Sequence, residues 1–89
     1  MHIKRGLIVK EMDNEFILID AGIEPPFFNG IIIINETGKR IIELLSKQDY
    51  SYEDLCVFLL DEYEVKLDEL KKVIDPFLEE LKRVKLLYE

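Results

Sequence analysis

Four consecutive isoleucines, Ile31–Ile34, form the strongest short hydrophobic segment of the chain and predict a β-strand. Turn-forming residues precede this segment, and Asn35 follows it at a position where an asparagine side chain can cap a helix. Because side chains alternate between the two faces of a strand, the isoleucines make both faces apolar. One face can pack on helices of the same chain, so the other face, or the edge of the strand, needs a different cover.

Two earlier segments predict a β-hairpin that joins this strand in one sheet. Leu7–Met12 and Glu15–Asp20 are rich in aliphatic residues, and Asp13-Asn14 between them supplies a two-residue turn. A glycine and two prolines indicate a loop from Ala21 to Asn29. We therefore expect a small, mostly antiparallel sheet of three strands, which is stable only when one of its faces is covered.

Three amphipathic helices are predicted after the sheet. The first covers Glu36–Ser46, the second begins after Ser51 as its capping residue, and the third runs from about Leu67 to Val84. The apolar stripes at helical spacing consist of Gly38, Ile41, Ile42 and Leu45 in the first helix, Tyr52, Leu55, Cys56, Leu59 and Tyr63 in the second, and Leu67, Leu70, Ile74, Phe77, Leu78 and Leu81 in the third. A sheet followed by helices predicts an α+β fold with the helices on one face of the sheet.

Two residues in these helices are expected to affect the backbone. Gly38 lies in the first turn of its helix, where the absent side chain lets another segment come close. Pro76 lies inside the third helix and cannot donate a hydrogen bond to the carbonyl of Lys72. We expect Pro76 either to kink this helix or, with Asp75 as a cap, to start a new one.

The composition is that of one folded domain over residues 1–89, with the sheet at about residues 7–35 and the helices at about 36–84. No segment stays apolar over the ~20 residues of a membrane span, and the N-terminus lacks the apolar core of a signal peptide. We therefore expect a cytoplasmic protein that does not contact membranes. The net charge of −7 argues against nucleic acid as a partner, because phosphates favour basic surfaces.

The residue types that catalysis and metal binding need are scarce in this sequence. His2 is the only histidine and is expected at a mobile terminus, so it cannot join a second histidine in acid–base chemistry. Cys56 is the only cysteine and lies on an apolar stripe, which favours a buried core residue over a nucleophile. We expect no enzyme activity, no cofactor and no metal site.

Several short motifs, taken in their order and spacing, resemble the PqqD family. The resemblance extends from about Leu7 to Leu87. The motifs are Phe28-Asn29-Gly30 with the isoleucine strand, Asn35-Glu36-Thr37-Gly38, Ile41-Ile42-Glu43-Leu44-Leu45, Glu62-Tyr63-Glu64-Val65, and Phe77-Leu78-Glu79-Glu80-Leu81 followed by Leu86-Leu87. The resemblance implies a three-stranded antiparallel sheet followed by three helices, similar to winged helix-turn-helix domains. It also implies a non-catalytic recognition element for ribosomally synthesised, post-translationally modified peptides.

The resemblance further implies two partners: the leader segment of a precursor peptide and a modifying enzyme, such as a radical S-adenosylmethionine (SAM) protein. In the family, the leader pairs with the edge of the third strand and lies against the third helix. Main-chain hydrogen bonds then supply affinity, and apolar pockets take alternate leader side chains. Carried over by position, the peptide-binding residues are Ile31, Ile32, Ile33, Ile34, Leu70, Lys71, Val73, Ile74 and Phe77.

Each of these residues also has an interpretation that involves no ligand. Alternate isoleucines and the helix stripe must supply the core whatever the function is. Lys71 and Lys72 either meet acidic leader residues or belong to a solvated helix face. Two departures from the family pattern stand out: Ile42 replaces an aromatic residue that many members carry, and Pro76 could reshape the groove.

A protein-interaction adaptor or a transcriptional regulator of winged-helix shape is the competing function. A homodimer that pairs Ile31–Ile34 with its own copy would cover the same strand edge. A DNA-binding protein needs basic residues on its recognition helix. The third helix instead contains several acidic residues, namely Asp68, Glu69, Asp75, Glu79 and Glu80.

Overall fold

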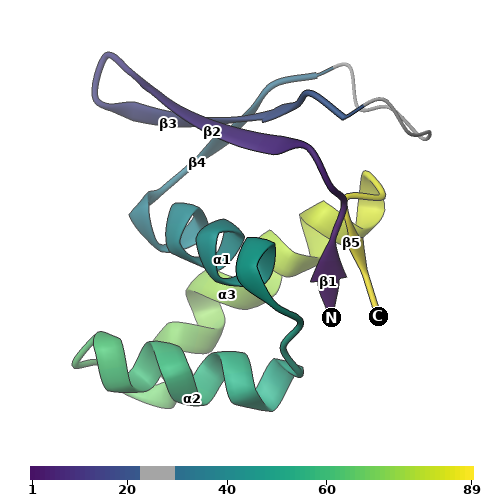
Figure 1. Cartoon of the computed structure of the whole chain (residues 1–89). Helices are drawn as coiled ribbons and strands as arrows, with labels where there is room; N and C mark the ends of the chain where they lie inside the picture. Colours follow the sequence, from purple (N-terminus) through teal and green to yellow (C-terminus); the bar gives the residue numbers. More distant parts are fainter. Residues whose placement is uncertain (23–29) are drawn as a thin grey trace.

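The computed structural model describes residues 1–22 and 30–89, and it shows the sheet before the helices (Figure 1). The strands are β1 (His2–Ile3), β2 (Leu7–Met12), β3 (Glu15–Asp20), β4 (Ile32–Ile34) and β5 (Leu87–Tyr88), and the helices are α1 (Glu36–Lys47), α2 (Tyr52–Glu62) and α3 (Leu67–Arg83). Strands β2, β3 and β4 form one antiparallel sheet in that order, which confirms the predicted α+β fold. The likeness to winged-helix domains stays a prediction. Most of the predicted loop at residues 21–29, with Phe28 and Asn29 of the first motif, lies outside the described residues.

The predicted hairpin is confirmed in its bounds and its turn. Met12 pairs with Glu15 at the closed end of the hairpin. The two turn residues, Asp13 and Asn14, have φ angles of 50° and 67°. Positive φ at both positions is the geometry of a type I′ turn, whose twist matches that of the flanking strands.

The sheet has one face packed on the helices and one face open. Leu18, on β3, is fully buried opposite Ile32 on β4, and Ile34 is also buried. On the other face, Ile33 and Ile8 remain exposed. Figure 1 shows α1 and α3 on one side of the sheet, with α2 farther from it. The isoleucine segment therefore faces the core with alternate side chains only.

The helices begin where the sequence predicts, and their apolar stripes supply most of the helical core, although Leu67 of the predicted third stripe is 41% exposed. The Asn35 side chain accepts a hydrogen bond from the Gly38 N–H at the start of α1, and Ser51 accepts one from the Asp54 N–H at the start of α2. These two side chains satisfy amide groups that have no partner within the helix. The buried helical residues are Gly38, Ile41, Ile42, Leu44 and Leu45 of α1, Leu55, Cys56 and Leu59 of α2, and Leu70, Ile74, Leu78 and Leu81 of α3.

Helix α3 continues through Pro76 as one element. The alternative that Pro76 starts a new helix is therefore wrong. Buried residues lie on both sides of the proline, with Ile74 before it and Leu78 after it. Their burial in one core stabilises a continuous helix although Pro76 supplies no N–H for the turn before it.

The two ends of the chain form a second, two-stranded sheet that the sequence did not predict. His2 pairs with Tyr88 and Ile3 pairs with Leu87, so the expectation of a mobile N-terminus is wrong. The reason is burial: Ile3 and Leu87 both join the core, and Met1 packs against it. Beside this ribbon, the Lys4 ammonium lies 2.7 Å from the Asp20 carboxylate, with both side chains almost fully buried. In the described part of the chain, no helix has the length and apolar character that crossing a membrane requires.

Candidate functional site

Strand β4 forms one edge of the three-stranded sheet. Within the described residues it pairs with β3 on one side and with no strand on the other. In an antiparallel pair, every second residue directs its N–H and C=O groups away from its partner strand. The outer edge of β4 therefore offers backbone donors and acceptors to an added strand.

The four isoleucines predicted to bind a peptide divide into two sets. Ile34 is 6% exposed and Ile32 is half-buried, and both face the helices. Ile31 is 70% exposed and Ile33 is 64% exposed, and Ile33 lies opposite Ile17 on the open face of the sheet. Two isoleucines thus anchor the strand, while the other two remain accessible next to its edge.

Helix α3 comes close to β4 at Gly38 of α1, where no side chain separates Phe77 from Ile34. A Cβ atom at Gly38 would lie 3.2 Å from the Ile34 Cβ and 3.2 Å from the Cζ atom of Phe77. Such distances are tighter than ordinary van der Waals contacts between carbon atoms. Gly38 therefore lets Phe77 of α3 lie beside the end of β4, as the sequence predicted for a close approach.

The predicted α3 residues differ in their accessibility. Leu70 is 4% exposed and Ile74 is 0% exposed, so both side chains lie in the core. Val73 is 42% exposed, and Phe77 is half-buried one turn farther along the same flank of the helix. Val73 and Phe77 are the apolar residues of this set that a peptide can touch without rearrangement of the core.

Lys71 lies on the opposite flank of α3 from Val73 and Phe77. Four residues after Lys71, Asp75 accepts a hydrogen bond of 2.6 Å from the Tyr52 hydroxyl of α2. At 100° per residue, Lys71 and Asp75 share the flank that faces α2. The structure therefore does not place Lys71 together with Val73 and Phe77.

Lys39 is a cation that the sequence analysis did not select. Its ammonium lies 4.8 Å from the centre of the Phe16 ring, and Phe16 pairs with Ile34 across the sheet. A cation over an aromatic face is attracted by the ring quadrupole. Lys39 also forms a partly exposed ion pair of 3.8 Å with Glu43. The sequence signal for this position is its place directly after Gly38, where α1 meets the sheet.

The described residues include no constellation for covalent chemistry. No three His, Cys, Asp or Glu side chains among them gather closely enough to hold a metal ion. Cys56 is buried, and this burial raises the pKa of its thiol, which disfavours the reactive thiolate. His2 stacks on Tyr88 with ring centroids 5.4 Å apart. The arrangement at β4 and α3 is suited to binding a chain segment.

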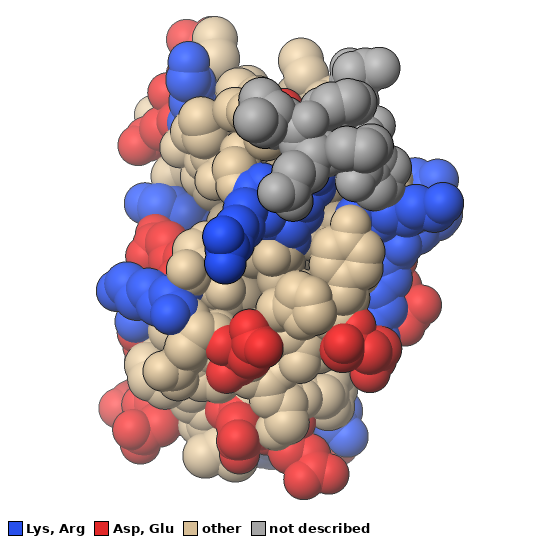
Figure 2. All heavy atoms as spheres, turned by 45° about the vertical axis from the view of Figure 1, so that its right-hand side comes forward, with Lys and Arg blue, Asp and Glu red and all other residues tan. Residues whose placement is uncertain are grey.

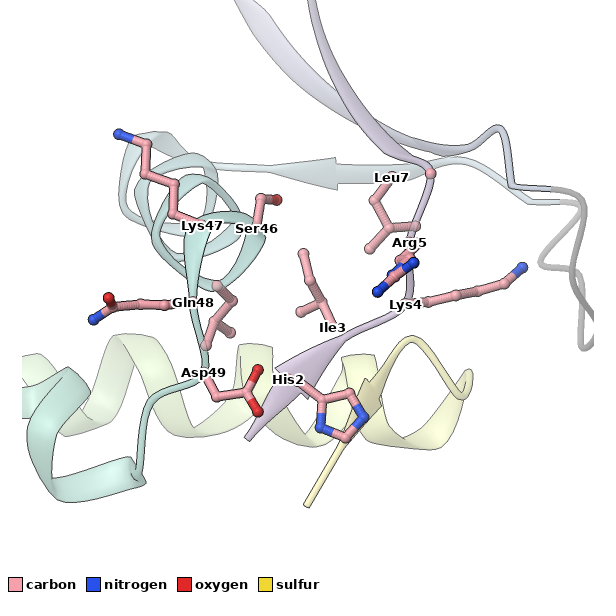
Figure 3. Close-up of a pocket in the computed structure, with 11 residues that line it drawn as sticks. His2, Ile3, Lys4, Arg5, Leu7, Ser46, Lys47, Gln48 and Asp49 are labelled. Atoms are coloured by element: carbon pink, nitrogen blue, oxygen red, sulfur yellow. The ribbon is translucent and has the colours of Figure 1, made fainter.

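A separate hollow of about 630 Å³ lies between β1, the turn into β2 and the C-terminal end of α1. Figure 3 shows Ile3 directed into this hollow and Lys47 directed away from it. The lining mixes both charge signs and has no dominant apolar wall: His2, Ile3, Lys4, Arg5, Gly6, Leu7, Leu45, Ser46, Lys47, Gln48 and Asp49. Lys4 is already neutralised by Asp20, so this hollow shows no specific ligand chemistry.

Comparison with models of known protein families assigns this chain to a family. The family model described as Coenzyme PQQ synthesis protein D (PqqD) matches residues 11–87. The chain belongs to the PqqD family. The matched residues include β3, β4 and all three helices, so the resemblance seen in the sequence motifs is confirmed. No curated protein and no solved structure matched the chain.

PqqD proteins are non-catalytic accessory proteins that act with a modifying enzyme and a peptide in the synthesis of coenzyme PQQ. This membership agrees with a site that offers a strand edge and an apolar wall.

Proposed function

We propose that this chain binds the leader segment of a ribosomally synthesised precursor peptide by strand addition to β4. The bound leader is then presented to a modifying enzyme of the radical SAM type. Family membership supports a role beside a peptide-modifying enzyme. The observation that carries the proposal is the open edge of β4, which has Phe77 of α3 beside its end.

Both the backbone and the side chains of this site would contact a bound leader. An added strand would extend the sheet, and its main chain would bond to the outer edge of Ile32–Ile34. Alternate side chains of the leader would then point to opposite faces. One set would lie beside Ile34, Phe77 and Val73, and the other set would lie beside Ile31 and Ile33. Ile32 contributes through its backbone, whereas Leu70 and Ile74 hold α3 in position from the core.

Bond-making chemistry belongs to the partner in this proposal. The chain supplies affinity and orientation for the leader. The enzyme supplies the iron–sulfur cluster and the S-adenosylmethionine that radical SAM chemistry uses. Holding the leader at a fixed edge raises the local concentration of the precursor at the enzyme. The modification itself takes place on the part of the precursor outside the leader.

A homodimer through the same edge is the competing candidate. Ile31 and Ile33 are exposed beside the edge of β4 that no strand of residues 1–22 and 30–89 pairs with, and a second copy of β4 could pair there. Such a dimer would compete with a leader for the same backbone groups. Light scattering over a concentration series distinguishes the two, because only the dimer changes mass with protein concentration.

The test is an NMR titration of the isotope-labelled chain with the leader half of the precursor encoded beside its gene. Saturable shifts are expected at Ile32–Asn35, Val73 and Phe77. Val73→Asp should weaken binding about tenfold, because it places a charge on the apolar wall. Val65→Asp is the matched control: Val65 is also 42% exposed but precedes α3, and this variant should bind normally. A folded monomer that shows no shifts at high peptide concentration would disprove leader binding.

A further inference from the structure

The outward face of α2 combines exposed apolar and acidic side chains in a regular pattern. Asp54, Val57, Phe58 and Asp61 are all exposed, and their spacing of three, one and three residues places them on one side of the helix. Val57 is 66% exposed and Phe58 is 38% exposed. Val57 and Phe58 lie outside the core, with the Asp54 carboxylate one turn before them and the Asp61 carboxylate one turn after them.

The apolar centre of this face is a preformed shallow hollow of about 530 Å³. Phe58 lines this hollow and contacts Tyr50 edge to face, with ring centroids 6.2 Å apart. The Arg40 guanidinium lies 5.6 Å from the Phe58 ring and is itself held by Glu62 at 2.9 Å. Both contacts hold the ring before a partner arrives, which lowers the entropy cost of binding. The hollow is lined by Tyr50, Asp54, Val57, Phe58, Leu60 and Asp61.

The charge around this hollow is negative and largely unneutralised. Helix α2 contains no lysine or arginine, and Arg40 of α1 pairs with Glu62. Glu53, Asp54 and Asp61 form no salt bridge within the part of the chain that the structure describes. Figure 2 shows acidic side chains gathered toward the lower end of the molecule, the end at which Figure 1 places α2.

The α2 face is remote from the strand edge proposed for the leader. Figure 1 places α2 at the end of the molecule opposite the three-stranded sheet, with α1 and α3 between them. Helix α2 is joined to α3 through the hydrogen bond between Tyr52 and Asp75. An occupant of the α2 face would therefore leave β4 free to hold a peptide.

We infer that this face docks the modifying enzyme through a surface segment in which an apolar side chain is flanked by lysine or arginine. The inference rests on the proposed function, since it assigns the enzyme's contact to a surface separate from the leader's. Asp54 and Asp61 are seven residues apart, or about 10 Å along the helix, so the enzyme's two cations would have a similar separation. Apolar contact in the hollow supplies affinity, and the paired charges supply specificity and faster encounter. The same carboxylates repel nucleic acid and anionic lipid, so a protein partner fits this surface.

The first experiment probes the surface chemistry with a defined peptide. The probe is a 14-residue helical peptide with leucines on one face and arginines on both flanks, and its control has glutamate in place of each arginine. NMR titration of the labelled full chain should give saturable shifts at Asp54, Val57, Phe58 and Asp61, with a Kd below about 1 mM. The glutamate peptide should bind at least about tenfold more weakly, because its charges face the carboxylates.

Matched variants separate specific docking from general attraction to an acidic protein. Val57→Glu should weaken binding of the arginine peptide about tenfold although it adds negative charge, because it removes the apolar contact. Val65→Glu makes the same change outside the face and should bind the peptide normally. Asp54→Asn/Asp61→Asn should also weaken binding, whereas Glu53→Gln/Glu64→Gln alters the net charge equally and should have little effect.

The second experiment connects the face to the enzyme encoded with the precursor. Asp54→Lys/Asp61→Lys should keep the leader affinity of the unmodified chain and lower kcat/KM for precursor modification about tenfold. Absence of leader binding in the unmodified chain would disprove the proposed function instead. The present inference would be overturned if the leader binds normally but Asp54→Lys/Asp61→Lys leaves kcat/KM unchanged and Val57→Glu leaves binding of the arginine peptide unchanged. Peptide shifts spread evenly over the surface would overturn it as well. A dimer of the chain alone that Val57→Glu dissociates would assign the face to a second copy and overturn it as well.

Discussion

Phe77 of α3 lies against Gly38 of α1, with its Cζ atom 3.2 Å from the position that a Cβ of Gly38 would occupy. The same missing side chain leaves space for Ile34 at the end of β4. One glycine therefore sets the separation of the sheet from two helices. It also determines how close the wall of α3 comes to the strand edge proposed to bind the leader.

Gly38→Val should destabilise the protein by about 1–3 kcal/mol, because its side chain would enter a space that Phe77 and Ile34 already fill. Urea unfolding measures the loss. Thr37→Val is a suitable control, since it puts a valine in the same helical turn at a half-buried position that already holds a β-branched side chain of similar size. Equal stability of Gly38→Val and the unmodified chain would show that α3 can move away freely.

Asp20→Ala should be among the most damaging single substitutions in this chain. It would remove the carboxylate that lies 2.7 Å from the buried ammonium of Lys4, and with it the acceptor of the Gly22 N–H. Breaking a buried pair in this way costs about 3–5 kcal/mol. Lys4→Met/Asp20→Leu should recover a large part of this loss in the same unfolding assay. A loss of less than about 1 kcal/mol for Asp20→Ala would show that water solvates this pair.

The hydrogen bond from Tyr52 to Asp75 should make the unmodified chain more stable than Tyr52→Phe, and this difference should disappear at alkaline pH. This bond favours the neutral phenol and, together with burial, raises the pKa of Tyr52 above its ordinary value near 10. The unfolded state therefore loses the Tyr52 proton first as the pH rises. The bond stabilises the fold below about pH 10 by about 1 kcal/mol, and this contribution is lost as the pH rises toward the higher folded-state pKa.

Tyr52→Phe removes that bond and serves as the reference for this prediction. The unmodified chain should be more stable than Tyr52→Phe between pH 6 and pH 9, and the difference should shrink above pH 10. Unfolding of both proteins by urea across this pH range gives the comparison, since their other tyrosines titrate alike. A constant difference up to pH 11 would contradict the assignment of the raised pKa to this bond.

Strand addition to β4 predicts that only alternate amides of the leader are needed for binding. N-methylation of the leader residues that face β4 should weaken binding at least about tenfold, because each methyl group removes a main-chain donor. N-methylation of the intervening residues should have a small effect. Isothermal titration calorimetry with the two methylated peptides measures the contrast. Equal affinity of both peptides would indicate binding through side chains alone.

The sequence predicted those parts of the fold that depend on local chemistry. The two-residue turn at Asp13 and Asn14, the Asn35 and Ser51 caps, and most of the buried helix stripes follow from short segments. The β1–β5 ribbon was missed because two-residue strands have no hydrophobic period. Ile3 and Leu87 are 84 positions apart, and only the folded core brings them together.

The candidate site was predictable at the level of elements and less so for single residues. The sequence located β4 and α3, but the set of peptide-binding residues carried over by position combined the core residues Leu70 and Ile74 with the accessible Val73. The flank of α3 that Lys71 occupies depends on where α2 packs, as the bond between Tyr52 and Asp75 shows. Tertiary arrangement therefore decides which members of a stripe can reach a ligand.

The pairing of His2 with Tyr88 also determines how this domain can be built into larger proteins. Because the two ends of the chain lie in neighbouring strands, the whole domain fits into a single surface loop of a host protein without stretching either connection. A short linker between the ends could likewise produce a circular permutant, with new termini in the exposed Asp13–Asn14 turn. Such fusions would attach the domain to an engineered enzyme at two points and restrict its rotation.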